Sequence, residues 1–197
     1  LAVGVNPANP GGVGVAATLA QATHLAFDCD TRSAFGGIVA VNRVIDHATV
    51  DEMIAAAQAD VVIAPGYEDG VIEALAKKRK NTRVLTATPP TSGTRQYREI
   101  DGGFLVQQAH HFASPRAEWR VVTQRQPSEA EFADAELAWT VCGYVNSNAI
   151  VFVKDGQAVG LGAGPPNRVE SGCIAATKAA GRARGGAGAA DAVQPFP

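Results

Sequence analysis

The stretch GGIVAVNRVIDHATVDEMIAAAQADVVIAPG, residues 36–66, decides the fold class. Its continuous apolar run at 36–41 predicts a buried strand, and the alanine-rich run at 46–59 predicts a helix. A second strand is predicted at 60–64 and ends at Pro65-Gly66. A strand, a helix and another strand in this order indicate parallel strands covered by helices, and therefore an α/β fold.

The same alternation continues on both sides of this stretch. Apolar periodicity predicts further helices at 15–27 and 68–80 and further strands at 83–87 and 104–108. Residues 88–103 mix prolines, glycines and polar side chains, and we expect a loop there. A linker-like stretch, AHHFASPRAE at 109–118, then indicates a boundary between two units.

The second unit is expected to alternate in a similar way before a glycine- and alanine-rich tail. Its predicted elements are a strand at 119–123, a helix at 127–145, a two-stranded hairpin over 148–164 and a helix at 168–183. Ser128 and Glu131 have the spacing of a capping box, in which each side chain binds the other residue's backbone N–H. Asp155-Gly156 is a strong signal for the turn of the hairpin.

Composition limits the classes of partner. The chain has 197 residues, 46% of them hydrophobic, and a formal net charge of −2, which is too weak a field to favour nucleic acid or an anionic membrane. No apolar run approaches the ~20 residues of a membrane span, and no basic-then-apolar signal leads the sequence, so a cytoplasmic protein is expected. The three cysteines are widely spaced, which favours reduced thiols over a metal site.

Two glycine-containing loops each allow two interpretations. The stretch NPGGVGVAAT at 9–18 precedes a predicted helix, so its N–H groups could bind an anion, or it could be an ordinary turn. In DCDTRSAFGGIVA at 28–40, glycines at the start of a strand would let a ligand approach the backbone. The alternative there is a tight strand entry with Phe35 in the core.

Two polar groups are also ambiguous. Asn146 and Asn148 lie between a predicted helix and a predicted strand, where their amides could recognise a carbonyl or amide, or could simply end the helix. His110 and His111 lie in the expected linker and could transfer protons, although surface imidazoles are common. Spacing alone therefore predicts an α/β protein with a small-molecule site.

Several motifs, taken together, carry a resemblance to a known family. They are SAFGGIVAVNR (33–43), DVVIAPGYEDGVIEALAKKRKNTRVL (60–85), DGGFLVQ (101–107), VVTQRQPSEAEFADAELAWTVCGYVNSNAIVF (121–152), GQAVGLGAGPPNRVES (156–171) and ADAVQPF (190–196). In this order they resemble the transformylase part of the bifunctional purine-biosynthesis enzyme with AICAR formyltransferase and IMP cyclohydrolase activities. The resemblance covers nearly the whole sequence.

This resemblance implies a fold and a reaction. The fold would be two tandem cytidine-deaminase-like subdomains, each a sheet flanked by helices, at 1–113 and 114–197, the second truncated at its C-terminal part. The reaction would transfer a formyl group from 10-formyltetrahydrofolate to the amine of AICAR without a metal. The family also implies a homodimer with shared sites that binds a nucleotide and a folate. The cyclohydrolase domain has no counterpart in this sequence.

The resemblance assigns site residues position by position. Phe35 and Gly36 match the family loop over the aminoimidazole nucleotide, Asp60 an acid near that substrate, and Asn148 the amide that helps position the carboxamide and the transferred group. Arg168, Asp191, Pro195 and Phe196 match positions on the nucleotide or folate side.

The catalytic loop departs from the family. Asn6 and Pro7 occupy the positions of the family's Lys-His pair, of which the histidine handles protons. Neither an amide nor a proline ring ionises near neutral pH, so neither replaces that pair. Two hypotheses stay open: a remodelled formyltransferase in which another group serves as the base, and a catalytically silent or repurposed relative that binds a nucleotide or folate, or acts as a partner subunit.

Overall fold

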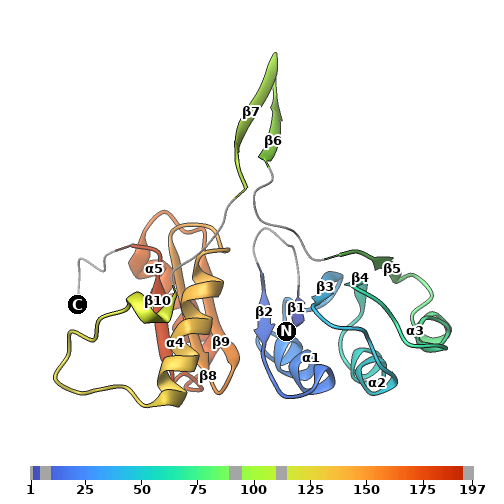
Figure 1. Cartoon of the computed structure of the whole chain (residues 1–197), viewed down its shortest axis with the longest axis horizontal. Helices are drawn as coiled ribbons and strands as arrows, with labels where there is room; N and C mark the ends of the chain where they lie inside the picture. The colour runs from blue at the N-terminus through green and yellow to red at the C-terminus, as the bar shows by residue number, and fades with distance from the viewer. Residues whose placement is uncertain (1, 5–9, 89–94, 110–114, 193–197) are drawn as a thin grey trace.

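The parallel strands lie where the sequence predicts them. The computed structural model describes residues 2–4, 10–88, 95–109 and 115–192, without the side chains of 2–4. Strands β3 (Gly37–Val41), β4 (Ala59–Ala64) and β5 (Arg83–Thr86) pair in parallel. Helices α2 (His47–Ala55) and α3 (Val71–Lys78) connect them in turn. The α/β prediction is therefore confirmed, and these elements form the right-hand side of Figure 1.

The second half of the chain adds an antiparallel part to the same sheet. Strands β8 (Ala149–Lys154) and β9 (Gln157–Ala163) form the predicted hairpin, with Asp155 and Gly156 at positive φ in its turn. Helices α4 (Glu129–Cys142) and α5 (Arg168–Ala179) pack against it. Ser128 and Glu131 form both hydrogen bonds of the capping box, as predicted.

The N-terminal strands join the two parts. Strands β1 (Ala2–Gly4) and β2 (Gly12–Gly14) complete an eight-stranded sheet of order β10-β8-β9-β2-β1-β3-β4-β5, in which β2 meets β9 through Gly14 and Gln157. Helix α1 (Leu19–Asp28) begins after its N-cap Thr18, later than the start predicted at residue 15.

The glycines at 11–14 mainly allow a helix to pack closely against a strand. A Cβ on Gly14 would lie 2.8 Å from Leu25 Cβ and 2.9 Å from Ala26 N, so α1 can pack against β2 only if the strand carries glycine. The sequence predicted either an anion-binding loop or an ordinary turn for this stretch, and neither prediction includes strand β2.

Three further segments differ from prediction. Residues 95–100, expected in a loop, form β6 (Arg95–Ile100), which pairs with β7 (Gly103–Gln108). The glycine- and alanine-rich tail contributes β10 (Ala187–Ala190). The strand predicted at 119–123 is wrong: those residues follow a short 3-10 helix, η1 (Arg116–Glu118), without strand structure. The edge of β8 is occupied by β10.

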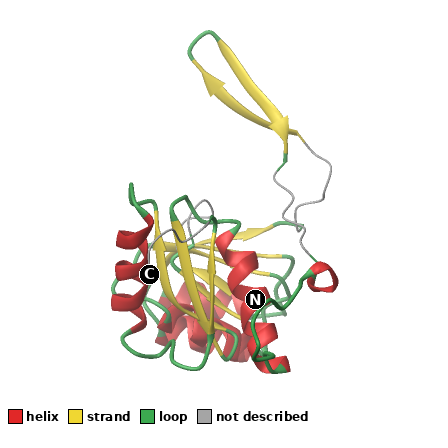
Figure 2. Cartoon of the chain, turned by 90° about the vertical axis from the view of Figure 1, so that its left-hand side faces the viewer, coloured by secondary structure: helices red, strands yellow, loops and turns green. Residues whose placement is uncertain are grey.

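The β6–β7 hairpin stands away from the body of the molecule (Figures 1 and 2). All its strand residues are exposed. Buried side chains gather instead on the eight-stranded sheet, in two clusters. One packs β3, β4, α2 and α3, and the other packs β8, β9 and α4. The expected boundary between residues 113 and 114 lies within a segment outside the described residues and stays a prediction.

Within the described ranges, none of the helices combines the length and the apolar character that crossing a bilayer requires.

Candidate functional site

Three residues that the family resemblance singles out meet at one end of the antiparallel strands. Asn148 directly precedes β8, Arg168 is the first residue of α5, and Asp191 follows β10. Arg168 Nη1 donates to Asn148 Oδ1 at 2.9 Å, and Arg168 Nη2 donates to Asp191 Oδ1 at 2.6 Å. Three segments separated by about 20 residues each thus form one hydrogen-bonded chain, which we call the Asn148 cluster.

Electrostatics keep Asp191 ionised within this cluster. Partial burial by itself raises the pKa of its carboxyl group, but hydrogen bonds from the Ser147 side chain and the Ala149 N–H, together with the Arg168 charge, outweigh it. The net result is a pKa below the ordinary value of an aspartate. The carboxylate therefore remains a negatively charged acceptor for Arg168 at neutral pH.

The loop before α5 supplies further contacts to Asn148. Asn148 Nδ2 donates to the carbonyl oxygens of Pro165 and Pro166, at 3.1 and 3.0 Å. The hydroxyl of Ser171, which is fully buried, donates to the carbonyl oxygen of Asn148 at 2.8 Å. Sequence reasoning overlooked these three partners. These contacts join Asn148 to residues 17, 18 and 23 positions away, which no local pattern connects.

A second set of predicted site residues lies at the amino ends of β3 and β4. Gly36 has φ of 74° and donates its N–H to Gln58 O at 2.8 Å. A Cβ on Gly36 would lie 3.7 Å from Asp60 Oδ2, so the loop backbone and this carboxylate are neighbours. Phe35 is 74% exposed, so its alternative placement in the core is wrong. Among the described residues, no hydrogen bond connects this set to the Asn148 cluster.

The segment just before Phe35 is bound to the C-terminal end of α5. Asp30 binds Lys178 of α5 at 2.9 Å and accepts a hydrogen bond from the Ser33 hydroxyl at 2.9 Å. Arg182 donates to the carbonyl oxygens of Asp28 and Cys29, both at 3.0 Å. These contacts fasten the end of α1 to the end of α5 and thereby hold the two halves of the chain together.

The structure does not describe the remaining predicted site residues. Asn6 and Pro7, the residues at the family's catalytic pair, lie outside the described residues, as do Pro195 and Phe196. The same is true of His110 and His111. Their roles stay predictions.

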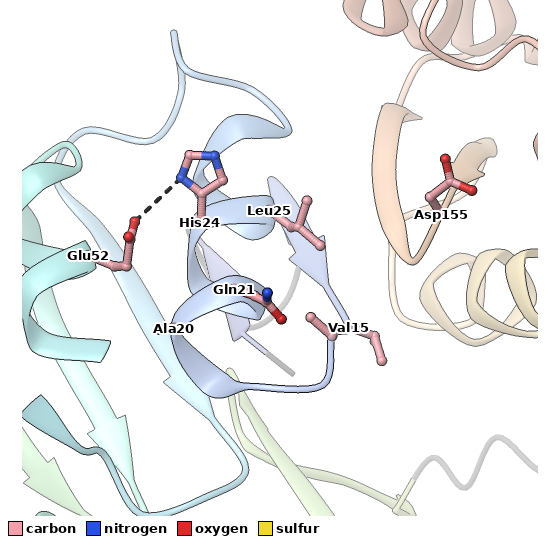
Figure 3. A pocket seen from close by; sticks show the side chains of 8 residues that line it. Val15, Ala20, Gln21, His24, Leu25, Glu52 and Asp155 are labelled. Atoms are coloured by element: carbon pink, nitrogen blue, oxygen red, sulfur yellow. Dashed lines mark ion pairs between the residues drawn. The ribbon is translucent and has the colours of Figure 1, made fainter. Parts of the chain in front are cut away.

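A cavity of about 580 Å³ lies away from both sets of residues. Figure 3 shows its lining, in which His24 of α1 faces Glu52 of α2 at 3.4 Å and Asp155 stands on the far side. Its volume is ample for a small ligand. However, its lining contains none of the residues that carry the resemblance, so we place the candidate site at the Asn148 cluster. In the described ranges, no group of three or more His, Cys, Asp or Glu side chains is arranged to hold a metal ion.

Comparison with known proteins agrees with the resemblance. A family model described as AICARFT/IMPCHase bienzyme matches residues 1–178. Three similar relatives carry the name bifunctional purine biosynthesis protein PurH. They come from Roseobacter denitrificans (47% identical, 89% of this chain), Dinoroseobacter shibae (45%, 98%) and Nostoc punctiforme (44%, 95%). The matches cover 33%, 39% and 36% of those relatives, so the chain spans about a third of their length.

Proposed function

Because the chain belongs to the AICARFT/IMPCHase bienzyme family, we propose that it serves formyl transfer in purine or purine-like biosynthesis. The donor would be 10-formyltetrahydrofolate. The acceptor would be the amine of an aminoimidazole carboxamide ribonucleotide or a related substrate. No metal takes part in the proposed reaction.

The Asn148 cluster is the observation that carries this proposal. Asn148, Arg168 and Asp191 match the family at separate motifs, yet hydrogen bonds of 2.9 and 2.6 Å join them. A weakly nucleophilic amine needs to be held on the formyl carbon, and fixed polar groups of this kind supply such orientation. We place the carboxamide and the transferred group at Asn148, with the nucleotide beside Arg168.

The other assigned residues complete the proposed site. Phe35, Gly36 and Asp60 would face the aminoimidazole nucleotide, and the exposure of Phe35 leaves its ring free to cover a ligand. The folate would lie on the side of Asp191, Pro195 and Phe196. Asn6 and Pro7 would stand where the family places its proton-transferring pair.

The two-subdomain architecture and the dimer are part of the proposal. Residues 1–113 and 114–197 would be the two cytidine-deaminase-like subdomains, and the protein would act in the cytoplasm as a homodimer.

The projecting β6–β7 hairpin supports the homodimer. Its register places Tyr97, Phe104 and Val106 on one face, and these side chains are 64%, 64% and 50% exposed. A two-stranded hairpin is marginal by itself, and exposed large apolar side chains gathered on it are typical of an interface. Sedimentation velocity tests this directly, because a chain that stays monomeric at micromolar concentration contradicts the dimer.

The second candidate function is binding without catalysis. It is favoured by Asn6 and Pro7, because neither side chain can shuttle a proton and the loss of a general acid or base costs about 10²–10⁴ in rate. In that case the same cluster would bind the nucleotide or folate for a regulatory or partner role.

A single-turnover assay with AICAR and 10-formyltetrahydrofolate separates the two functions, alongside calorimetric titration of each ligand. Product formation supports formyl transfer, whereas binding without product supports the silent relative. The double substitution Asn6→Lys with Pro7→His should increase the rate if the rest of the site is intact. Absence of both binding and turnover contradicts both candidate functions.

A further inference from the structure

The chain contains three Asp-Gly pairs, at 69–70, 101–102 and 155–156. In such a pair the glycine nitrogen can attack Cγ of the aspartate side chain, because no Cβ on the glycine obstructs its approach. A C–N bond forms and closes a five-membered succinimide, while the carboxyl hydroxyl and the N–H proton leave together as water. Hydrolysis adds the water back. Cleavage of the new C–N bond restores aspartate, whereas cleavage of the original peptide bond gives isoaspartate of the same mass.

The fold ties down the reacting nitrogen in the pair at 155–156. Asp134, which is 4% exposed, accepts the N–H of Gly156 at 2.9 Å and that of Asp155 at 3.0 Å. The carbonyl oxygen of Gly156 accepts from Val15 N at 2.8 Å. The nitrogen can attack only after it gives up a buried acceptor, and the turn that would have to rotate is bound to the neighbouring chain.

The pair at 69–70 is anchored on both sides of the reacting nitrogen. The carbonyl oxygen of Asp69 lies 3.0 Å from His47 Nε2. Gly70 is the N-cap of α3, and its carbonyl oxygen accepts from Ala74 N at 3.0 Å. The peptide group between the two residues is therefore held at the start of a helix.

The pair at 101–102 has no comparable contacts. It forms the turn of the β6–β7 hairpin, which stands away from the body of the molecule (Figures 1 and 2). Asp101 is exposed, and the N–H of Gly102 donates to none of the residues that the structure describes. A Cβ on Gly102 or Gly103 would meet nothing within 4 Å. The nitrogen and the backbone around it are thus free for the attack.

We propose that Asp101-Gly102 is a site of spontaneous isomerisation of aspartate to isoaspartate in the folded protein, and that the fold protects the other two pairs. The only co-reactant is water. Isoaspartate routes the chain through its side-chain carbons and lengthens a two-residue turn by one backbone atom. Because the turn fixes the register of a hairpin, the modification loosens the pairing of Ile100 with Gly103. This inference does not depend on formyl transfer.

Peptide mapping after prolonged incubation tests the proposal. The purified protein is kept for several weeks near neutral pH at physiological temperature. Endoproteinase Glu-C then releases the peptides 100–118 and 137–170, in which Asp101 and Asp155 are the only aspartates. Isoaspartate is measured by methyl transfer from an isoaspartyl methyltransferase. The peptide 100–118 should contain at least about tenfold more isoaspartate than 137–170, because attack at Gly156 first requires local opening.

Incubation in guanidinium chloride provides the reference without the fold. In the unfolded chain the two peptides should gain isoaspartate at similar rates, because no tertiary contact then distinguishes them. Asp101→Ser should remove the signal from 100–118.

A variant of the protecting residue tests the cause. Asp134→Ala releases the N–H of Gly156 and should increase isoaspartate in 137–170 severalfold. The matched control on the same helix is Thr140→Ala, whose exposed hydroxyl contacts only the carbonyl oxygen of Glu136, and it should change nothing. The comparison of native and unfolded chain stands whether or not Asp134→Ala folds.

Three results would overturn the proposal. They are equal isoaspartate in the two peptides from the folded native protein, no isoaspartate in 100–118, and more isoaspartate at Asp69 than at Asp101. The level at Asp69 is read from the tryptic peptide 44–77.

Discussion

Replacing Gly162 by alanine should disturb the packing of α5 on β9 and, through it, the candidate site. A Cβ on Gly162 would lie 2.7 Å from the carbonyl carbon of Ser171 and 3.0 Å from its Cα, with the carbonyl oxygen closer still. All three atoms belong to the backbone of α5, so no side-chain rotation relieves the overlap. The helix itself must move away from the sheet.

The size of the effect follows from these distances. Carbon atoms in contact are normally about 3.5 Å apart or more, so α5 must shift by roughly 1 Å near Ser171. Overpacking that forces a backbone shift costs about 3 kcal/mol, the upper end of the usual range. For a chain of this size, that loss corresponds to a decrease in Tm of about 6–12 °C. Because Arg168 begins α5, the shift should also stretch its hydrogen bond to Asn148.

Thermal unfolding followed by circular dichroism measures the loss. Gly172→Ala is the matched control, since a Cβ at this helix position meets nothing within 4 Å. Alanine replaces glycine in a helix with a gain of about 0.5–1 kcal/mol, so the control should raise Tm slightly. A Gly162→Ala variant that unfolds at the native temperature would refute the packing of α5 described above.

Three further predictions concern other parts of the structure. Asp134→Ala should lower the free energy of unfolding by about 2 kcal/mol in urea titrations, because the buried Asp134 carboxylate accepts the N–H groups of Asp155 and Gly156 in the hairpin turn. Asp134→Asn should lower the free energy of unfolding by less. The folded-state pKa of Asp191 lies below its unfolded value, so the stabilisation that its carboxylate contributes is complete above the unfolded pKa and disappears as pH falls through the folded pKa. Asp191→Asn should therefore flatten the dependence of the free energy of unfolding on pH, measured from pH 6 down to about pH 2. Burial raises the pKa of the Cys29 thiol to about 12 and that of Cys142 to about 11, so Ellman's reagent should label only Cys173 quickly in the folded chain, and rapid labelling of three thiols would contradict the described burial.

The regular elements could be predicted where the local signals were strong. The capping box at Ser128 and Glu131 and the Asp155-Gly156 turn depend on residues a few positions apart, and both formed as expected. Strand β10 escaped prediction because its sequence, AGAA, carries no β-propensity of its own. It forms a strand because its backbone pairs with the edge of β8.

The candidate site was likewise predictable only in part. Family motifs marked Asn148, Arg168 and Asp191, but nothing local indicated that they touch or that Pro165 and Pro166 supply acceptors. Those contacts join residues about 20 positions apart, and only the docking of α5 and β10 beside β8 brings them together.

The sequence by itself determined the α/β class, most of the helices and strands, the family and which residues are candidates for the site. These depend on side-chain periodicity, local hydrogen bonds and residue type, which are written along the chain. The tertiary structure decided which glycines permit close packing, which strand takes each sheet edge, and which way the Asn148 amide points. Those outcomes depend on steric contact and hydrogen-bond polarity between distant segments, and such partners exist only after the chain has folded.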